Sequence, residues 1–65
     1  SEVDNVLITF RRSDDRPLPQ GYRVQDGVLY LTNVDESAAG EYACVGTDRI
    51  SGTILFTIYS TIQVL

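Results

Sequence analysis

The chain has 65 residues, 43% of them apolar, and a formal net charge of -4, so it forms one small domain at most. With no His and a single Cys, it excludes an intrachain disulfide and a zinc site built from nitrogen and sulfur ligands. The acidic balance argues against binding to nucleic acid or to anionic membrane surfaces, and the short apolar runs argue against membrane insertion of this segment.

The first predicted element is a strand over residues 6–12. Its apolar and polar residues alternate, which places Val6, Ile8 and Phe10 on one face, as in a half-buried strand. Val, Ile and Thr make up 18 of the 65 residues in the whole chain, and these β-branched types favour pleated surfaces. We therefore expect an all-β protein.

A loop over residues 13–21 follows, with two prolines and a glycine. Two short strands are then expected, over residues 22–25 and 28–32. Between them lies the dipeptide Asp26-Gly27, which favours positive φ and is typical of a tight hairpin turn.

The second half of the chain predicts a connection and two longer strands. In the connection, Asp35, Glu36 and Ser37 can cap a single helical turn. A strand is expected over residues 41–47, and the longest alternation begins at Thr53. One face of this last strand is expected to carry Ile54, Phe56, Ile58, Ile62 and Val64. Five short strands at this spacing are typical of a sandwich or a barrel.

A Leu-x-Leu pair, a following Val and a Gly-x-Tyr-x-Cys run stand at fixed offsets between residues 27 and 44. This constellation resembles strand E, the E–F turn and strand F of an immunoglobulin-like domain of the intermediate (I) set. The matching residues are Leu29, Leu31, Val34, Gly40, Tyr42 and Cys44. The resemblance implies that Leu29, Leu31 and Val34 point into the core. It also implies that Gly40 permits the reversal into strand F.

The resemblance also assigns structural roles near the core. It implies that Tyr42 buries its ring while its hydroxyl bonds the backbone at the corner, and that Cys44 faces the opposite sheet. Phe10 stands where the family places a Trp on strand C. An ion pair common in the family is in doubt, because Ala38 replaces its Asp, although Arg23 stands at the place of its Arg.

The fold class expected from the resemblance is an all-β, immunoglobulin-like sandwich, with residues 1–65 forming a single partial domain. The resemblance implies that the chain covers strands C to G and that the N-terminal strands A and B are missing from it. In the family, strand B carries the partner of the conserved cysteine, so Cys44 is expected to be one half of a disulfide whose other half is absent from this chain. Without strand B, an exposed strand edge, expected at strand E, can support self-association.

The function implied by the resemblance is non-catalytic. The chain is expected to be a module of a larger, secreted or cell-surface protein, where it serves as a spacer and a protein-interaction or adhesion surface. Residues 11–19 and 27–29 are similar to modules of perlecan-type basement-membrane proteoglycans. The alternative is an intracellular I-set module of a giant muscle-type protein with a mechanical role.

Candidate surface residues lie in two places. Arg11 and Arg12 end the first strand and Arg16 lies in the loop after it, while Asp48 and Arg49 lie in the predicted F–G turn. They are expected to contact an unidentified protein partner. Arg suits sulfated glycans, but the neighbouring Asp14 and Asp15 favour mutual neutralisation over glycan binding.

Enzymatic and metal sites are not expected. Catalysis by Cys44 needs a base, and the chain offers no His or Lys, so a core cysteine is the favoured interpretation. Four carboxylates in two short runs lack the spacing of a calcium loop and are expected to be solvated. These carboxylates are Asp14, Asp15, Asp35 and Glu36. No cofactor is expected.

Overall fold

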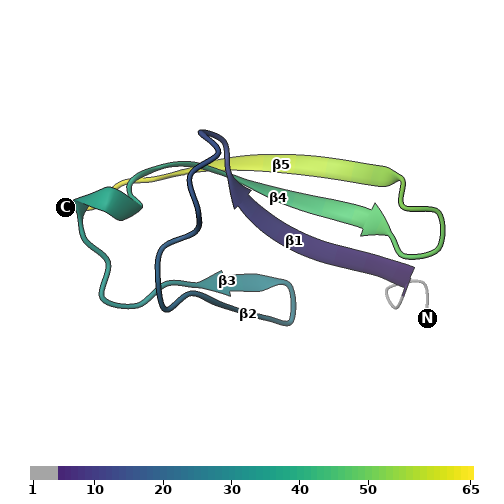
Figure 1. The fold of residues 1–65 in the computed structure, drawn as a ribbon, viewed down its shortest axis with the longest axis horizontal. Coiled ribbons are helices and arrows are strands. Elements are labelled where there is room, and N and C mark those ends of the chain that lie inside the picture. The colour runs from purple at the N-terminus through teal and green to yellow at the C-terminus, as the bar shows by residue number, and fades with distance from the viewer. Residues whose placement is uncertain (1–4) are drawn as a thin grey trace.

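The computed structural model describes residues 5–65 and is mostly β (Figure 1). Its elements are β1 (Val6–Arg12), β2 (Arg23–Gln25), β3 (Val28–Tyr30), the 3-10 turn η2 (Glu36–Ala38), β4 (Gly40–Asp48) and β5 (Ile54–Ile62). No helix in this part of the chain is long and apolar enough to cross a membrane. The β-rich class predicted from composition and alternation is confirmed.

Three strands form one antiparallel sheet in the order β1-β4-β5, so β4 lies in the centre. In the middle of this sheet Phe10 pairs with Cys44, and Cys44 pairs with Ile58. Because paired residues point to the same side, these three side chains share one face, here called the inner face. The opposite face, at the neighbouring positions, carries Arg11, Ala43 and Tyr59.

The two remaining strands, β2 and β3, form a separate hairpin that lies beside the sheet (Figure 1). Asp26 and Gly27 at its turn both have positive φ, of 53° and 75°, as expected for this dipeptide. Arg23 pairs with Tyr30 across the hairpin, and its guanidinium carbon lies 4.8 Å from the centre of the Tyr30 ring. Arg23 therefore stacks within the hairpin.

The predicted helical turn forms as η2 immediately before β4. Asp35 caps it, because its carboxylate accepts a hydrogen bond from the Ser37 N–H at 2.9 Å. Ala38 ends the turn with only 1% of its surface exposed. The turn thus brings the chain back to the end of the sheet where β4 begins.

A β-bulge interrupts the long alternation of β5. Phe56 lies opposite Gly46, but Ile54 lies opposite Thr47, so the register shifts by one residue between them. The shift moves Ile54 out of the face that Phe56 and Ile58 share, and the expectation of one continuous apolar face from Ile54 is wrong. Gly46 is buried, and a Cβ at this position would overlap the Phe56 ring.

The sheet and the hairpin do not make a full sandwich. The buried apolar residues are Ala38, Tyr42 and Ala43, and no large side chain in the described part of the chain is fully buried. The radius of gyration is 12.9 Å, whereas a compact domain of this length has about 11 Å. The accessible surface is 4968 Å², against about 4100 Å² for a compact protein of this mass. Much of the apolar inner face is therefore uncovered.

Val34 departs from its predicted place in the core. It is 47% exposed and lies on a hollow formed by the 19–21 loop and the segment before η2. β3 ends at Tyr30, two residues earlier than predicted, and Asn33 then turns the chain with a φ of 53°. Val34 consequently never reaches the inner face, and the prediction that it points inward is wrong.

Candidate functional site

The corner between η2 and β4 is organised by Tyr42. Its ring is 4% exposed, and its hydroxyl donates to the carbonyl oxygen of Ala38 at 2.7 Å. This is the hydrogen bond expected for a tyrosine two residues before the cysteine. Ser60 lies opposite Tyr42 on β5, and both residues line the same apolar hollow, so the small serine leaves room where the sequence interrupts the apolar face.

Arg12 completes the corner from the end of β1. Its guanidinium donates to three oxygens of the corner: Nη1 to Ser37 O at 3.0 Å and to the Tyr42 hydroxyl at 2.9 Å, and Nη2 to Ala39 O at 2.7 Å. Its Nε donates to Asp14 Oδ1 at 3.3 Å. Arg12 is only 3% exposed. The prediction that Arg12 belongs to an interaction surface is wrong, because the guanidinium is consumed in holding the corner together.

Gly40 is shaped by the same arginine. Its φ is 132°, which L side chains rarely adopt, and a Cβ there would lie 2.9 Å from Arg12 Nη2. Glycine therefore serves two purposes at the start of β4. It permits the reversal expected from the sequence, and it leaves the space that the guanidinium occupies.

An apolar hollow of about 290 Å³ separates the hairpin from the inner face of the sheet. Five predicted core residues line it together: Phe10, Leu29, Leu31, Tyr42 and Cys44. Ile58 and Ile62 of β5 also line it, but Ile58 remains 57% exposed. The structure thus assembles most of the predicted core at one place, and leaves that core open on the side of β5.

Cys44 lines this hollow as a half-buried free thiol. It pairs in the sheet with Phe10 and Ile58, whose side chains are apolar. No group of three or more potential metal ligands occurs among residues 5–65. The surroundings of the thiol suit packing against an opposing layer of apolar side chains.

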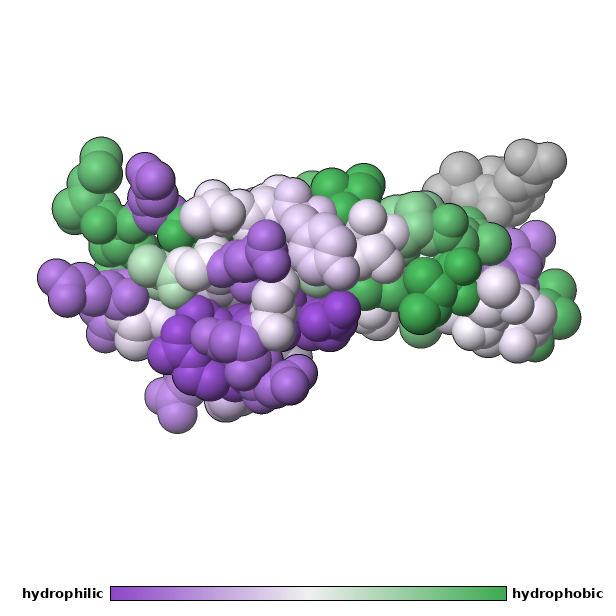
Figure 2. All heavy atoms as spheres, turned by 90° about the horizontal axis from the view of Figure 1, so that it is seen from above, coloured by the Kyte–Doolittle hydropathy of each residue, from purple (hydrophilic) through white to green (hydrophobic). Residues whose placement is uncertain are grey.

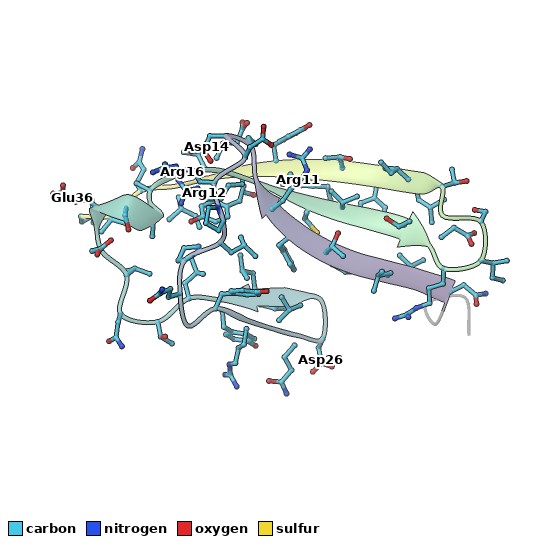
Figure 3. The ribbon with its side chains drawn as sticks, in the orientation of Figure 1. Arg11, Arg12, Asp14, Arg16, Asp26 and Glu36 are labelled. Carbon is cyan, nitrogen blue, oxygen red and sulfur yellow. The ribbon has the colours of Figure 1, made fainter. Side chains whose placement is uncertain are left out.

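Asp14 links Arg12, at the end of β1, to Arg16 in the loop that follows (Figure 3). Its carboxylate accepts hydrogen bonds from the Arg16 backbone N–H at 3.1 Å and from Arg16 Nε at 2.8 Å, and it also contacts Arg12 Nε at 3.3 Å. These bonds, with the Arg16 backbone N–H the largest cause, lower the pKa of Asp14 to about 2. The predicted neutralisation of Arg16 by a neighbouring carboxylate is confirmed.

The other predicted surface residues lie apart from this cluster. Arg11 is exposed, and it pairs with Ala43 on the outer face of the sheet. Asp48 and Arg49 lie at the opposite end of the sheet, in the β4–β5 turn. The Asp48 carboxylate accepts from the backbone N–H groups of Ser51 and Ile50, which lower its pKa in that order of strength. Asp48 therefore stabilises the turn, and the five candidates do not form one patch.

The roles of Arg12 and Gly46 were not anticipated. For Arg12 a signal exists, because it continues the alternation of Ile8 and Phe10 and so belongs to the inner face. For Gly46 no local signal exists, because its partner Phe56 lies on another strand, and the bulge sets their alignment.

No protein-family model matches the chain, and no curated protein or solved structure matches it.

Proposed function

We propose that the chain is a non-catalytic, immunoglobulin-like module of the I set that serves a secreted or cell-surface protein as a spacer and a protein-interaction surface. The observation that carries the proposal is the strand order β1-β4-β5, with the hairpin across the face that bears Cys44. This order is the C-F-G order of such a domain, with β2 and β3 in the places of strands D and E. The bond from Tyr42 to Ala38 supports the assignment of β4 as strand F.

The open inner face supports the same proposal. In an immunoglobulin-like sandwich a second sheet covers the inner face of C, F and G, and a cysteine of that second sheet bonds the cysteine of strand F. Cys44 and Ile58 lie where this cover would pack, and both remain partly exposed. The binding surface in this proposal is the outer face and the β4–β5 turn, where Arg11 and Arg49 are exposed.

A second candidate is an intracellular I-set module with a mechanical role. It is supported by the half-buried, apolar surroundings of Cys44, because modules of that kind work without the disulfide. In this candidate the antiparallel hydrogen bonds of β4 with its two neighbours resist stretching.

The two candidates differ in the chemical state of Cys44 in the cell. The protein is isolated from its native source with a thiol-alkylating reagent present, and the Cys44 peptide is examined by mass spectrometry before and after reduction. The extracellular proposal expects Cys44 to be blocked until a disulfide is reduced, and expects the protein on intact cells or in the medium. Immediate alkylation of Cys44 in protein found inside cells would refute the proposal in favour of the mechanical candidate.

A further inference from the structure

One edge of the three-stranded sheet is formed by β5, which pairs with β4 on one side and, among residues 5–65, with no strand on the other (Figure 1). Its nine residues include no charged residue, no Pro and no Gly. Natural edge strands are usually blunted by charges, prolines or short length, because an open edge pairs with other strands. β5 has none of these three protections, and its β-bulge lies between Ile54 and Phe56, before residues 57–61.

The side chains of β5 are as open as its backbone. Ile54, Leu55, Ile58 and Tyr59 are each more than 50% exposed. Seen from the β5 side, apolar surface gathers toward the end where β4 and β5 are joined (Figure 2). These side chains flank the open edge on both faces of the sheet, and exposed apolar surface gathered in this way marks an interaction site in a soluble protein.

The hydrogen-bond register shows which backbone groups of β5 point outward. The Ser13 N–H donates to Glu41 O, and the Arg49 N–H donates to Asn5 O, so the odd-numbered residues of β4 bond β1. Because hydrogen-bonded pairs alternate along antiparallel strands, the even-numbered residues of β4 bond β5, through Phe56, Ile58 and Ser60. The N–H and C=O groups of Thr57, Tyr59 and Thr61 therefore face the open edge.

We propose that two copies of the chain associate through β5, which pairs antiparallel with β5 of the second copy and joins two three-stranded sheets into one. A two-fold arrangement centred on Ile58 sets Thr57 opposite Tyr59 of the second copy, so the outward groups of these residues bond each other. The same arrangement brings the two Ile58 side chains together on the inner face, as a cross-strand apolar pair.

A second copy suits this edge better than a partner of another kind. A strand without charge offers nothing to select a charged partner, whereas its own antiparallel copy matches it in hydrogen bonds and in apolar side chains. The other edge strand, β1, ends in Arg11 and Arg12, and the hairpin strands have three residues each, so they offer shorter edges. The self-association expected at strand E is thus assigned to β5.

The size of the edge sets the expected strength. Nine residues extend over about 30 Å, which gives an interface at the small end of the range for specific complexes. We expect a reversible dimer with a dissociation constant of about 1 to 100 µM. The inference rests on strand order and exposure, and it does not depend on the proposed extracellular role.

The test is sedimentation equilibrium of the reduced chain from about 1 to 500 µM, a range that spans the expected dissociation constant. Thr57→Pro removes an N–H that faces the open edge but bonds nothing in β4, so the sheet is retained. Thr57→Val is the matched control, since it keeps the N–H. We expect the parent chain and Thr57→Val to dimerise alike, and Thr57→Pro to dimerise at least about ten-fold more weakly.

Amide hydrogen exchange of the unmodified chain gives a second readout that needs no variant. At dimer concentration the amides of Thr57, Tyr59 and Thr61 should gain protection, while those of Phe56, Ile58 and Ser60 are protected at every concentration. A chain that stays monomeric throughout the range would overturn the proposal. So would a dimer that Thr57→Pro leaves intact, or protection that appears on β1 in place of β5.

Discussion

Arg12 shows how one side chain can hold together segments that are distant in the sequence. It lies at the end of β1, and its guanidinium reaches the carbonyl oxygens of Ser37 in η2 and of Ala39 just before β4, and the hydroxyl of Tyr42. A charged side chain is almost never fully buried unless its donors are satisfied. In a chain with so few buried apolar residues, this network is a large part of what fixes the corner.

The planar fork of Arg12 should be essential. Arg12→Lys keeps the charge, but one ammonium cannot reach Ser37 O, Ala39 O and the Tyr42 hydroxyl together. We expect the free energy of unfolding to fall by about 2 to 4 kcal/mol, measured by urea denaturation followed by circular dichroism.

Arg11→Lys is the matched control for this change, because Arg11 is the adjacent residue and is exposed. It should change the free energy of unfolding by less than about 0.5 kcal/mol. If Arg12→Lys lowered the free energy of unfolding as little as Arg11→Lys does, Arg12 would contribute through its charge alone. That result would refute the network.

Asp14 makes the stability dependent on pH in the acid range. Its pKa is lowered from 3.8 to about 2 in the folded chain. A lowered pKa means that the carboxylate stabilises the fold above its unfolded pKa, and that this contribution is lost as the pH falls through the folded value. The pKa of Asp35 is lowered by hydrogen bonds from the Ser37 side chain and then from the Ser37 backbone N–H. The pKa of Asp48 is lowered as well, so both carboxylates change the stability in the same direction as Asp14. Stability should therefore decline between about pH 4 and pH 2.

Carbon-detected NMR titration of the Asp14 carboxyl tests this assignment. The midpoint should lie at about 2, and Arg16→Ala should raise it toward the ordinary value. The rise should be partial, because Arg16→Ala keeps the backbone N–H that contributes most to the shift. A midpoint that Arg16→Ala leaves unchanged would contradict the role of the Arg16 side chain.

At the scale of elements, one contact helps to set the alignment of β4 with β5. The Phe56 ring lies over Gly46, in the space that a Cβ would occupy, next to the bulge. Gly46 does not have a positive φ, so the glycine is required for space and not for its backbone conformation. The bulge and this contact together set where the apolar residues of β5 meet β4.

A double-mutant cycle measures that contact. Gly46→Ala should lower the free energy of unfolding by about 1 to 3 kcal/mol in the parent chain, because the Phe56 ring must move. In a Phe56→Ala background the same change should cost less than about 0.5 kcal/mol, since the space is then free. An equal cost in both backgrounds would mean that Phe56 does not occupy the space above Gly46.

Local sequence patterns predicted the elements better than their contacts. The strand over residues 6–12, the hairpin turn at Asp26 and the helical turn after Asp35 follow from alternation, turn chemistry and capping. The exposed place of Val34 and the buried place of Arg12 were not predicted, because both depend on how distant segments meet. The residues of the candidate surface were chosen because they are charged. Charge alone does not indicate which side chains are buried and hydrogen-bonded within the fold.

At the scale of the whole molecule, the chain is a sheet whose inner face is half covered. The hairpin closes over Phe10 and Cys44, while Ile58 remains open and β5 offers a free edge. The proposed module and the proposed dimer both follow from this shape. One needs a second layer over the inner face, and the other needs a strand beside β5.

Both proposals require that β4 lies between β1 and β5, and the proposed module also requires the hairpin across the inner face. Nuclear Overhauser contacts in the dilute, labelled chain measure this arrangement. We expect Hα–Hα contacts between Phe10 and Cys44 and between Ala43 and Tyr59, which are close pairs in antiparallel ladders. Leu29 methyl contacts should reach Phe10 and Cys44, which line the same hollow. Contacts of β1 with β5 would contradict the strand order and both proposals, and contacts of Leu29 with the outer face would contradict the proposed module.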